Sequence, residues 1–311
     1  METDNLPYIS VIITAYNRRE FLFNAIESAL KQTLDKEYYE IIVIKNFTDI
    51  NIDEFINKNK IKHIVMDGTV GEYLDKGISE AKGEIIAFLD DDDLFFENKL
   101  YIVYKKFKKD NNIAYYHNLY VAVNENGKII NNNNLNTSLD FNISSISIKK
   151  SIVKIQNARN INGATDVLMY IFALESDKKI IKGKEKLTYY MSHNSASHIV
   201  CNSIEEYRKF VINASDLYLS YYTHFNNMVH SRKAVNFLNS RRTGVIIDKY
   251  IFGADEYPDK LINYMINNPS NLKFKTAFFL SCILIKVYPG SRKYFSNKIW
   301  SIHNKWLNEA V

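Results

Sequence analysis

The sequence predicts an α/β protein with a mostly parallel central sheet in residues 1–200 and a helical region in residues 201–311. Three observations lead to this prediction. Apolar runs alternate with segments of helical periodicity through the first hundred residues, an order that implies parallel strands joined by right-handed crossovers. The run at 85–89 (IIAFL) is apolar throughout, as in a strand buried on both faces. Only helical patterns follow residue 204.

The first half of the sheet domain, residues 1–110, has the pattern of a nucleotide-binding α/β unit. Short runs rich in β-branched residues predict strands at 8–13, 40–44, 61–66 and 85–89. Apolar residues that recur with a helical period predict helices at 21–30, 72–82 and 97–109. Asn17 and Glu20 have the spacing of a capping box for the first helix, and Gly83 is placed to end the second.

In the second half, residues 111–200, predicted strands and helices no longer alternate regularly. We expect strands at 113–123, 143–148 and 187–191, and a helix at 166–175. Asn124-Glu125-Asn126-Gly127 is typical of a hairpin turn after the first of these strands.

Composition is that of a soluble globular chain of 311 residues, with 46% hydrophobic and 24% charged residues. A formal net charge of +5 without a compact basic cluster argues against a nucleic-acid partner. Cys201 and Cys282 lack metal-site spacing, which favours free thiols in a reducing compartment, with a single disulfide as the alternative. Residues 1–7 hold no secretory apolar core, and the apolar stretch at 276–285 is shorter than the roughly 20 residues of a membrane span. We therefore expect a cytoplasmic protein.

Four consecutive aspartates, Asp90 to Asp93, follow the apolar run at 85–89. The carboxyl ends of strands form the ligand-binding edge of open α/β sheets. Adjacent carboxylates repel one another, and a divalent cation with hard oxygen ligands relieves that repulsion. The sequence therefore predicts a divalent-cation site that can also hold phosphate oxygens. The alternative is a solvated loop in which Asp93 caps the helix at 97–109.

Several segments in order along residues 8–200 resemble the family 2 glycosyltransferases, which have the GT-A fold. The segments are ISVIITAYNR at 9–18, EIIVI at 40–44, GISEAKGEIIAFLDDDD at 77–93, Thr165-Asp166, and residues 190–197. The resemblance implies an inverting transferase of polysaccharide biosynthesis. Such an enzyme moves a hexose from a nucleotide sugar, here expected to be UDP-linked, to a hydroxyl of a glycan or lipid-linked acceptor. It also implies that residues 111–200 form the acceptor half.

By that resemblance, Asp90 and Asp92 form the DXD pair of the family. The resemblance implies Mg²⁺ or Mn²⁺ as the metal. Asp92 is expected to bind it directly, and Asp90 to face the nucleotide ribose or to reach the metal through water. Asp91 stands in the variable middle position, either as a further nucleotide contact or with no role in the site.

Thr14, Ala15, Tyr16 and Arg18 match the first nucleotide-binding turn of the family. Backbone groups of such a turn can bind a base edge, and the ring of Tyr16 can stack on the base. Arg18 is alternatively a solvated residue at the start of a helix.

The sequence departs from the family at two further turns. Lys45-Asn46 stands where acidic residues are common, and the Asn46 amide can both donate and accept at a base edge. Asp49 is either the displaced acidic residue or a helix cap. Asp75 stands where an Asn of the family contacts the donor, and is expected to bind a ribose or sugar hydroxyl. Lys76 either adds positive charge near the diphosphate or is a surface lysine.

Asp166 aligns with the general base of these inverting enzymes, which takes the proton of the attacking acceptor hydroxyl. Thr165 replaces the usual Glu before it, and a helix cap is the alternative role of Asp166. His193 matches a position near the diphosphate or the metal, with a purely structural role as the alternative.

The apolar residues of 274–285 have lysines on both sides. They could lie as a helix on an anionic membrane at the cytoplasmic face, or pack against the catalytic domain or a second copy in a homodimer. Two other functions stay open: a non-catalytic nucleotide-sugar-binding partner protein of the same fold, and a nucleotidyltransferase.

Overall fold

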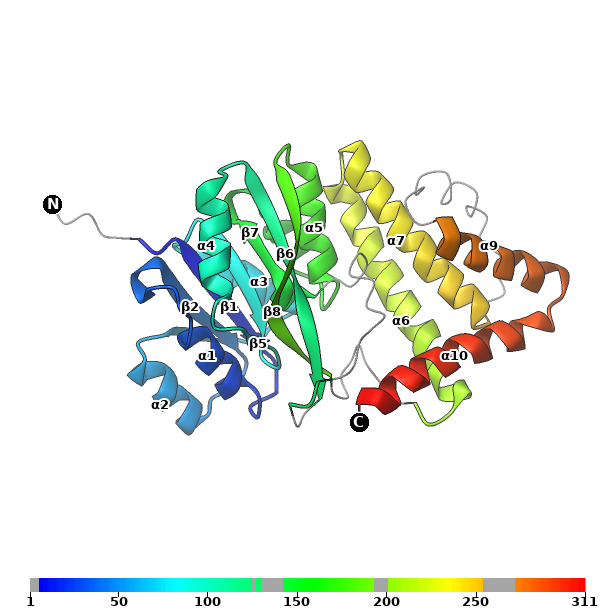
Figure 1. Ribbon diagram of the computed structural model, residues 1–311, viewed down its shortest axis with the longest axis horizontal. Coiled ribbons are helices and arrows are strands. Elements are labelled where there is room, and N and C mark those ends of the chain that lie inside the picture. Colours follow the sequence, from blue (N-terminus) through cyan, green and yellow to red (C-terminus); the bar gives the residue numbers. More distant parts are fainter. Residues whose placement is uncertain (1–5, 125–126, 130–141, 193–200, 254–271, 311) are drawn as a thin grey trace. The chain divides into compact units, whose positions relative to one another are not determined.

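The computed structural model describes residues 6–124, 127–129, 142–192, 201–253 and 272–310. The chain divides into two compact units, Met1–Ser192 and His193–Val311, each of which is described by itself (Figure 1). The sequence placed the end of the sheet domain at residue 200, close to this division.

The first unit is built on one eight-stranded mixed sheet with the strand order β3-β2-β1-β4-β7-β6-β8-β5. Four strands run parallel: β1 (Ile9–Ala15), β2 (Tyr39–Lys45), β3 (Lys62–Val65) and β4 (Ile85–Asp90). β7 (Ile146–Lys149) is antiparallel to β4 and to β6 (Ile113–Asn124). β8 (Lys179–Ser192) runs parallel to β6, and the two-residue β5 (Leu94–Phe95) pairs antiparallel with β8 at the edge.

The register of the parallel strands brings three strand ends to one edge of the sheet. Thr14 of β1 pairs with Asp90 of β4, and Ala15 pairs with Lys45 of β2. The turns that follow β1, β2 and β4 therefore begin side by side, which is where open α/β sheets bind their ligands.

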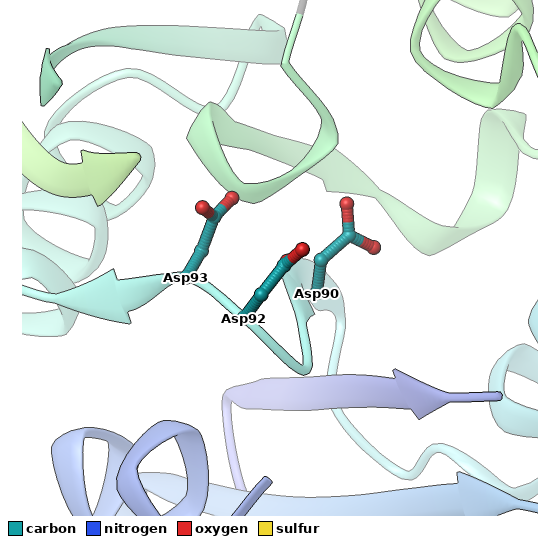
Figure 2. A group of neighbouring side chains, drawn as sticks. All are labelled: Asp90, Asp92 and Asp93. Atoms are coloured by element: carbon teal, nitrogen blue, oxygen red, sulfur yellow. The ribbon is translucent and has the colours of Figure 1, made fainter. Parts of the chain in front are cut away.

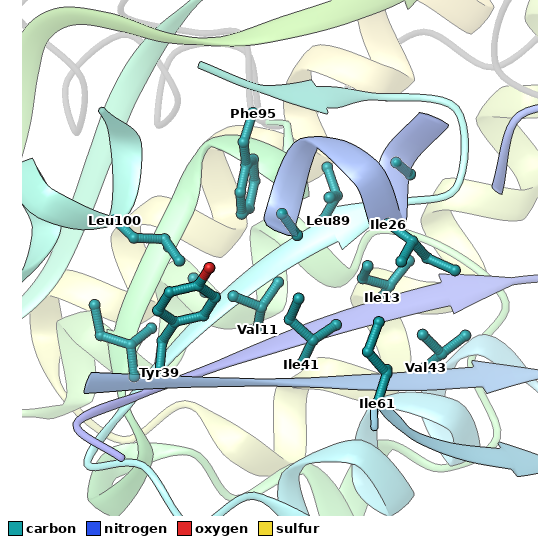
Figure 3. Close-up of a cluster of buried hydrophobic side chains, with 14 of the residues drawn as sticks. Val11, Ile13, Ile26, Tyr39, Ile41, Val43, Ile61, Leu89, Phe95 and Leu100 are labelled. Atoms are coloured by element: carbon teal, nitrogen blue, oxygen red, sulfur yellow. The ribbon is translucent and has the colours of Figure 1, made fainter. Parts of the chain in front are cut away.

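Helices cover both faces of the sheet because alternate residues of the central strands are apolar in both directions. Val11 and Ile13 point into a core shared with α1 (Leu22–Leu30), α2 (Ile50–Lys58) and α4 (Lys99–Lys109) (Figure 3).

The opposite face of the sheet carries α3 (Val70–Glu80) and α5 (Thr165–Glu175). A Cβ on Gly77 of α3 would lie 2.7 Å from Ile12 Cγ2, so a side chain there would push this helix off the sheet.

The predicted strands and helices of the first unit are confirmed in existence, and several boundaries are corrected. The strand predicted from residue 143 begins at Ile146, after the 3₁₀ helix η2 (Ile143–Ser145), and β8 begins at Lys179 instead of residue 187. Other 3₁₀ helices are η1 (Lys36–Tyr38), η3 (Lys150–Ile152) and η4 (Ile155–Ala158). The predicted hairpin turn lies partly outside the described residues, but Asn124 N donates to Lys128 O at 2.9 Å across it.

Two predicted helix caps, at Asn17 and Gly83, are wrong, and a third that the sequence offered as an alternative, at Asp93, does not form. Asn17 adopts a left-handed conformation (φ 59°), and α1 starts later, after Phe21, without a side-chain cap. Gly83 does not end α3, which has its C-cap at Ala81; it is a glycine because a Cβ would lie 2.6 Å from Ser10 N. Asp93 does not cap α4, whose N-cap is Asn98.

Two caps form where helices begin with the right local chemistry. Thr69 and Glu72 form a complete capping box at the start of α3. The Asp49 side chain accepts a hydrogen bond from Ile52 N at 3.1 Å and caps α2, which confirms the cap interpretation of this residue.

The second unit is helical in its described residues, as the sequence predicts. It contains α6 (Ile204–His224), α7 (Arg232–Ile251), α9 (Leu272–Val287), α10 (Ser291–Ala310) and the 3₁₀ helix η5 (Phe225–Met228). Cys201 and Cys282 lie buried in its core as free thiols, beside residues such as Tyr250 and Ile285. Among the described helices, none combines the length and the apolar character needed to cross a bilayer.

We expect Asp49→Ala to lower the free energy of unfolding by about 1 kcal/mol, because the first turn of α2 loses its side-chain acceptor. Asp49→Asn is the matched control, since its amide oxygen can accept the same hydrogen bond. Chemical denaturation of the three proteins measures the effect. Equal losses in both variants would show that the charge of Asp49, and not the cap, stabilises the fold.

Candidate active site

The turn after β4 gathers carboxylates at the ligand-binding edge of the sheet. Asp90, Asp92 and Asp93 each offer one oxygen, and these oxygens all lie within 4.8 Å of one another. Figure 2 shows the three side chains rising from the turn toward a common region. Three hard oxygen donors at this spacing suit Mg²⁺ or Mn²⁺, which take carboxylates together with water or phosphate oxygens. The residues present therefore fit the predicted metal.

Asp91 points elsewhere and forms an ion pair with Arg18 from the turn after β1. The Arg18 guanidinium donates through Nη2 to Asp91 Oδ1 and through Nη1 to Asp92 Oδ2, the latter at 2.6 Å. Asp91 is only 1% exposed, so its charge is largely removed from water. Arg18 thus connects the turn after β1, which the sequence predicts to bind the nucleotide, with the acidic turn. Arg18 and Asp91 are 73 residues apart in the chain.

Asp93 is fixed from the opposite side, by strands of the second half of the sheet. It is 1% exposed, accepts from Met191 N at 3.0 Å and lies 3.4 Å from Asn142 Nδ2. Ser144 holds the same turn by accepting from Asp90 N at 3.0 Å. The sequence left Asp93 open between a site residue and a cap, and in the structure its carboxylate lies with those of Asp90 and Asp92.

A buried lysine lies behind this support. Lys99 of α4 is fully buried and donates to the carbonyl oxygen of Ser144 and to Thr188 Oγ1, the latter at 3.2 Å. Its ammonium group also lies 3.9 Å from the centre of the Phe95 ring. Burial lowers the pKa of Lys99 well below its usual value, whereas the charge of Asp93 acts to raise it.

Burial dominates the protonation of the acidic turn. Desolvation, and then the charges of Asp92 and Asp93, raise the pKa of Asp90 well above its ordinary value. Burial raises the pKa of Asp91 to about 7 against the opposing charge of Arg18, and it raises the pKa of Asp93 to about 7 as well. The turn therefore gains from any cation that compensates its charge.

The turns after β1 and β2 are clamped together by a reciprocal pair of amide contacts. Asn17 N donates to Asn46 Oδ1, and Asn46 Nδ2 donates to Asn17 Oδ1, both at 2.8 Å. Tyr16 is 55% exposed at the same edge, with its ring centroid 6.3 Å from that of Tyr73. Asn46 thus uses donor and acceptor groups to shape the edge, leaving the ring of Tyr16 open to stack on a planar ligand.

Lys45 does not point into this edge. It is fully buried; its ammonium group lies 2.7 Å from Asp53 Oδ1 and donates to Phe47 O at 2.5 Å. The lysine that stands where acidic residues are common in the family therefore forms an ion pair with Asp53 of α2. The alternation of side chains along β2 was the signal that could have indicated it.

Asp75 is held by a residue that the sequence did not single out. Arg159 donates to Asp75 Oδ2 through Nε at 2.7 Å and lies within 2.6 Å of it through Nη2. The same segment meets the start of α3 at two further points: Gly71 N donates to Ile161 O at 2.9 Å, and Val70 N to Asn162 Oδ1 at 3.2 Å.

Lys76 forms a 2.6 Å ion pair with Glu80 one turn along α3, as expected of a surface lysine.

Asp166 lies in the first turn of α5, directly after this docked segment. Ala164, the residue before the helix, adopts a left-handed conformation with φ 56°, which turns the chain into α5. Asp166 is partly exposed, and its charge adds to burial in raising the pKa of Tyr115 well above its usual value. His193 lies outside the described residues.

A family model described as Glycosyl transferase family 2 matches residues 10–169, just over half of the chain. The matched segment contains all of β1 except its first residue, together with the acidic turn and the start of α5.

Two relatives show how far the similarity extends. An uncharacterized glycosyltransferase of Rickettsia bellii (strain RML369-C) is 39% identical over 128 residues, which cover 39% of this chain and 18% of that protein. The poly(ribitol-phosphate) beta-N-acetylglucosaminyltransferase TarP of Staphylococcus aureus (strain N315) is 27% identical over 217 residues, covering 62% of this chain and 66% of TarP. The chain therefore spans less than a fifth of the Rickettsia protein and about two thirds of TarP.

The fold also matches a solved structure. S. aureus TarS 1–349, crystallised in complex with UDP-GlcNAc, aligns with a TM-score of 0.52 and 15% sequence identity over 88% of each chain. At this identity the likeness concerns the fold alone. Together with the family match, it confirms the predicted GT-A fold.

We expect the stability of the metal-free protein to fall as pH rises between about 4 and 7. Asp91 and Asp93 titrate near 7 when folded and near 4 when unfolded, so the folded state binds more protons in this interval. Asp93→Asn should flatten this dependence, because it removes one of the buried carboxyl groups whose pKa is raised. Midpoints of thermal unfolding across pH 4 to 8 in EDTA measure it, with the exposed Asp177→Asn as control. An Asp93→Asn curve parallel to wild type would contradict the assignment.

We expect Arg18→Met to strengthen Mn²⁺ binding by about tenfold in the absence of nucleotide. The variant removes a positive charge that already pairs with Asp92, and like charges in a half-buried site repel by a few kcal/mol. Arg19→Met is the matched control, because Arg19 lies over the ring of Phe47. Calorimetric titration measures the affinities. Weaker binding in Arg18→Met would mean that Arg18 orients Asp92 for the metal and does not compete with it.

Proposed function

The chain belongs to glycosyl transferase family 2, and from this premise we propose that it is an inverting glycosyltransferase. It would move a hexose from a UDP-linked sugar to a hydroxyl of a glycan or lipid-linked acceptor. The observation that carries the proposal is the cluster of three carboxylate oxygens within 4.8 Å, at the sheet edge where the turn after β1 also lies. The first unit is proposed as the catalytic domain.

The donor is proposed to lie across the ends of β1, β2 and β4. Tyr16 offers an exposed ring to the base, and backbone groups of Thr14 and Ala15 lie at the start of the same turn. Asp92 and Asp90 are proposed to hold Mg²⁺ or Mn²⁺, with Asp93 as the third carboxylate. A bound divalent ion would supply positive charge to the diphosphate as it leaves the sugar.

Asp166 is proposed as the general base that takes the proton of the acceptor hydroxyl. The chain just before it is anchored to α3 by Arg159 on Asp75 and by the two backbone contacts at Gly71 and Val70. These contacts give Asp166 a fixed place relative to the nucleotide-binding half. Precise placement of a base matters because proton transfer needs hydrogen-bond distance.

The comparisons support a UDP-linked donor. TarS was crystallised with UDP-GlcNAc, and TarP is named as an N-acetylglucosaminyltransferase acting on poly(ribitol-phosphate). We therefore propose UDP-GlcNAc or a related UDP-hexose as the first donor to test, and a polymer with free hydroxyls as the acceptor class.

A second candidate is a non-catalytic nucleotide-sugar-binding protein. It is favoured by one observation: Asn46 and Asp75, both expected to contact the donor, already pair with Asn17 and Arg159. His193 remains a proposed contact of the diphosphate in either case.

Asp92→Asn and Asp166→Asn should separate metal-dependent donor binding from proton abstraction by the general base. We expect Asp92→Asn to lose the Mn²⁺-dependent thermal stabilisation by UDP-sugar. Asp166→Asn should keep this stabilisation while kcat for sugar transfer or donor hydrolysis falls about 100- to 10,000-fold.

The exposed Asp177→Asn is the control for an Asp→Asn change near the far end of α5. No UDP-sugar turnover by the wild-type protein, together with metal-dependent donor binding, would favour the non-catalytic candidate. No stabilisation by any nucleotide sugar would overturn both.

A further inference from the structure

One face of helix α9 is buried in the core of the second unit, and another face is exposed. Cys282 and Ile285 are buried in the core of the second unit, at 0% and 1% exposure. Leu284 and Val287 on the same helix are 43% and 61% exposed, and Leu280 one turn earlier is 50% exposed. The spacing of 280, 284 and 287 is that of one helical stripe, so the exposed apolar residues form a continuous row.

The row continues into the turn between α9 and α10. Tyr288 is 67% exposed and is followed by Pro289 and Gly290, both exposed. Tyr294 and Ile302 of α10 add exposures of 61% and 66%. Large apolar side chains exposed together on a soluble unit indicate a surface that contacts something else. We call residues 280, 284, 287, 288 and 294 the α9–α10 tip.

The charged residues of α9 and α10 themselves have a single sign up to residue 308. Residues 272–308 contain no Asp or Glu, and their basic residues are Lys273, Lys275, Lys286, Arg292, Lys293, Lys298 and Lys305. Lys286, Lys293 and Lys298 are exposed. The tip is therefore apolar in its row and basic at its border, in a protein whose whole net charge is only +5.

We propose that the α9–α10 tip docks on the surface of an anionic phospholipid bilayer. Its apolar row would enter the boundary between head groups and acyl chains, and the lysines would reach lipid phosphates with their long side chains. Tyr288 and Tyr294 suit the interfacial layer, where tyrosine is enriched. The row is far too short to span the bilayer.

Charge favours lipid over a second copy of the chain as the occupant. In a symmetric dimer each surface patch meets itself, so the lysines of one tip would face the lysines of the other. Repulsion of this kind opposes association, whereas an anionic leaflet attracts every lysine of the border.

Vesicle flotation with the full chain tests the proposal. We expect binding to vesicles of phosphatidylcholine with phosphatidylglycerol, about tenfold less binding to pure phosphatidylcholine, and weakening as salt rises. Val287→Asp with Tyr288→Asp should reduce binding to the anionic vesicles by about tenfold or more. Lys286→Gln, Lys293→Gln and Lys298→Gln together should remove the preference for anionic lipid.

Ile50→Asp is the matched control, because Ile50 is a 78% exposed apolar residue on α2 of the first unit. Circular dichroism melts establish that each variant is folded, and UDP-sugar hydrolysis in solution should stay unchanged in all of them. Vesicle binding can then be lost while hydrolysis is kept. A failure of the membrane proposal is therefore distinguished from a failure of the proposed activity.

Equal binding to neutral and anionic vesicles, or no loss in the Asp variants, would overturn the proposal. A concentration-dependent dimer of the wild-type chain, measured by light scattering and abolished by the same Asp variants, would overturn it in favour of a second copy.

Discussion

The structure of the first unit depends on one electrostatic constraint, the crowding of carboxylates at the end of β4. Two of the four aspartates, Asp91 and Asp93, are almost fully buried, where charge is costly without compensation. The fold compensates in two directions: Arg18 pairs with Asp91 and Asp92, while the backbone of Met191 donates to Asp93. What remains is a set of oxygens suited to a hard cation. A site that is incompletely neutralised by the protein keeps affinity for a charged ligand.

The sheet topology makes this arrangement possible. Parallel pairing places the turns after β1 and β2 beside the acidic turn, and the Asn17–Asn46 contacts fix the spacing of those two turns. The segment before β7, which is antiparallel to β4, and the end of β8, which is parallel to β6, then bring Ser144 and Met191 against the same turn from the other side. The two halves of the unit thus meet at the carboxylates, so the proposed donor site and the support for its metal are one structural feature.

The main feature of the second unit is that α9 has both a buried and an exposed apolar face. Its α9 buries Cys282 and Ile285 and exposes a row of apolar residues, which helix packing alone does not require. Sequence pattern left packing and membrane contact as rival interpretations of the segment. The structure shows that one face of the helix packs in the core, and membrane contact is our proposal for the exposed face. A lipid-linked acceptor and a basic, apolar tip would both bring the protein to a membrane surface, where diffusion in two dimensions favours their encounter.

The sequence by itself determined the elements and the chemistry. Apolar runs and helical periods located most of the strands and helices, because these signals are local, but α2 and β5 were not predicted. Four consecutive aspartates located the candidate site. Only the tertiary structure decided which way each side chain points. It paired Asp91 with Arg18, placed Asp93 beside Asp90 and Asp92, buried Lys45, and brought Arg159 to Asp75 across 84 residues of chain. The burial of Lys45 could have been inferred from the alternation along β2. The other outcomes depend on turns whose dihedral angles are set by distant partners, so no period or spacing in the chain encodes them.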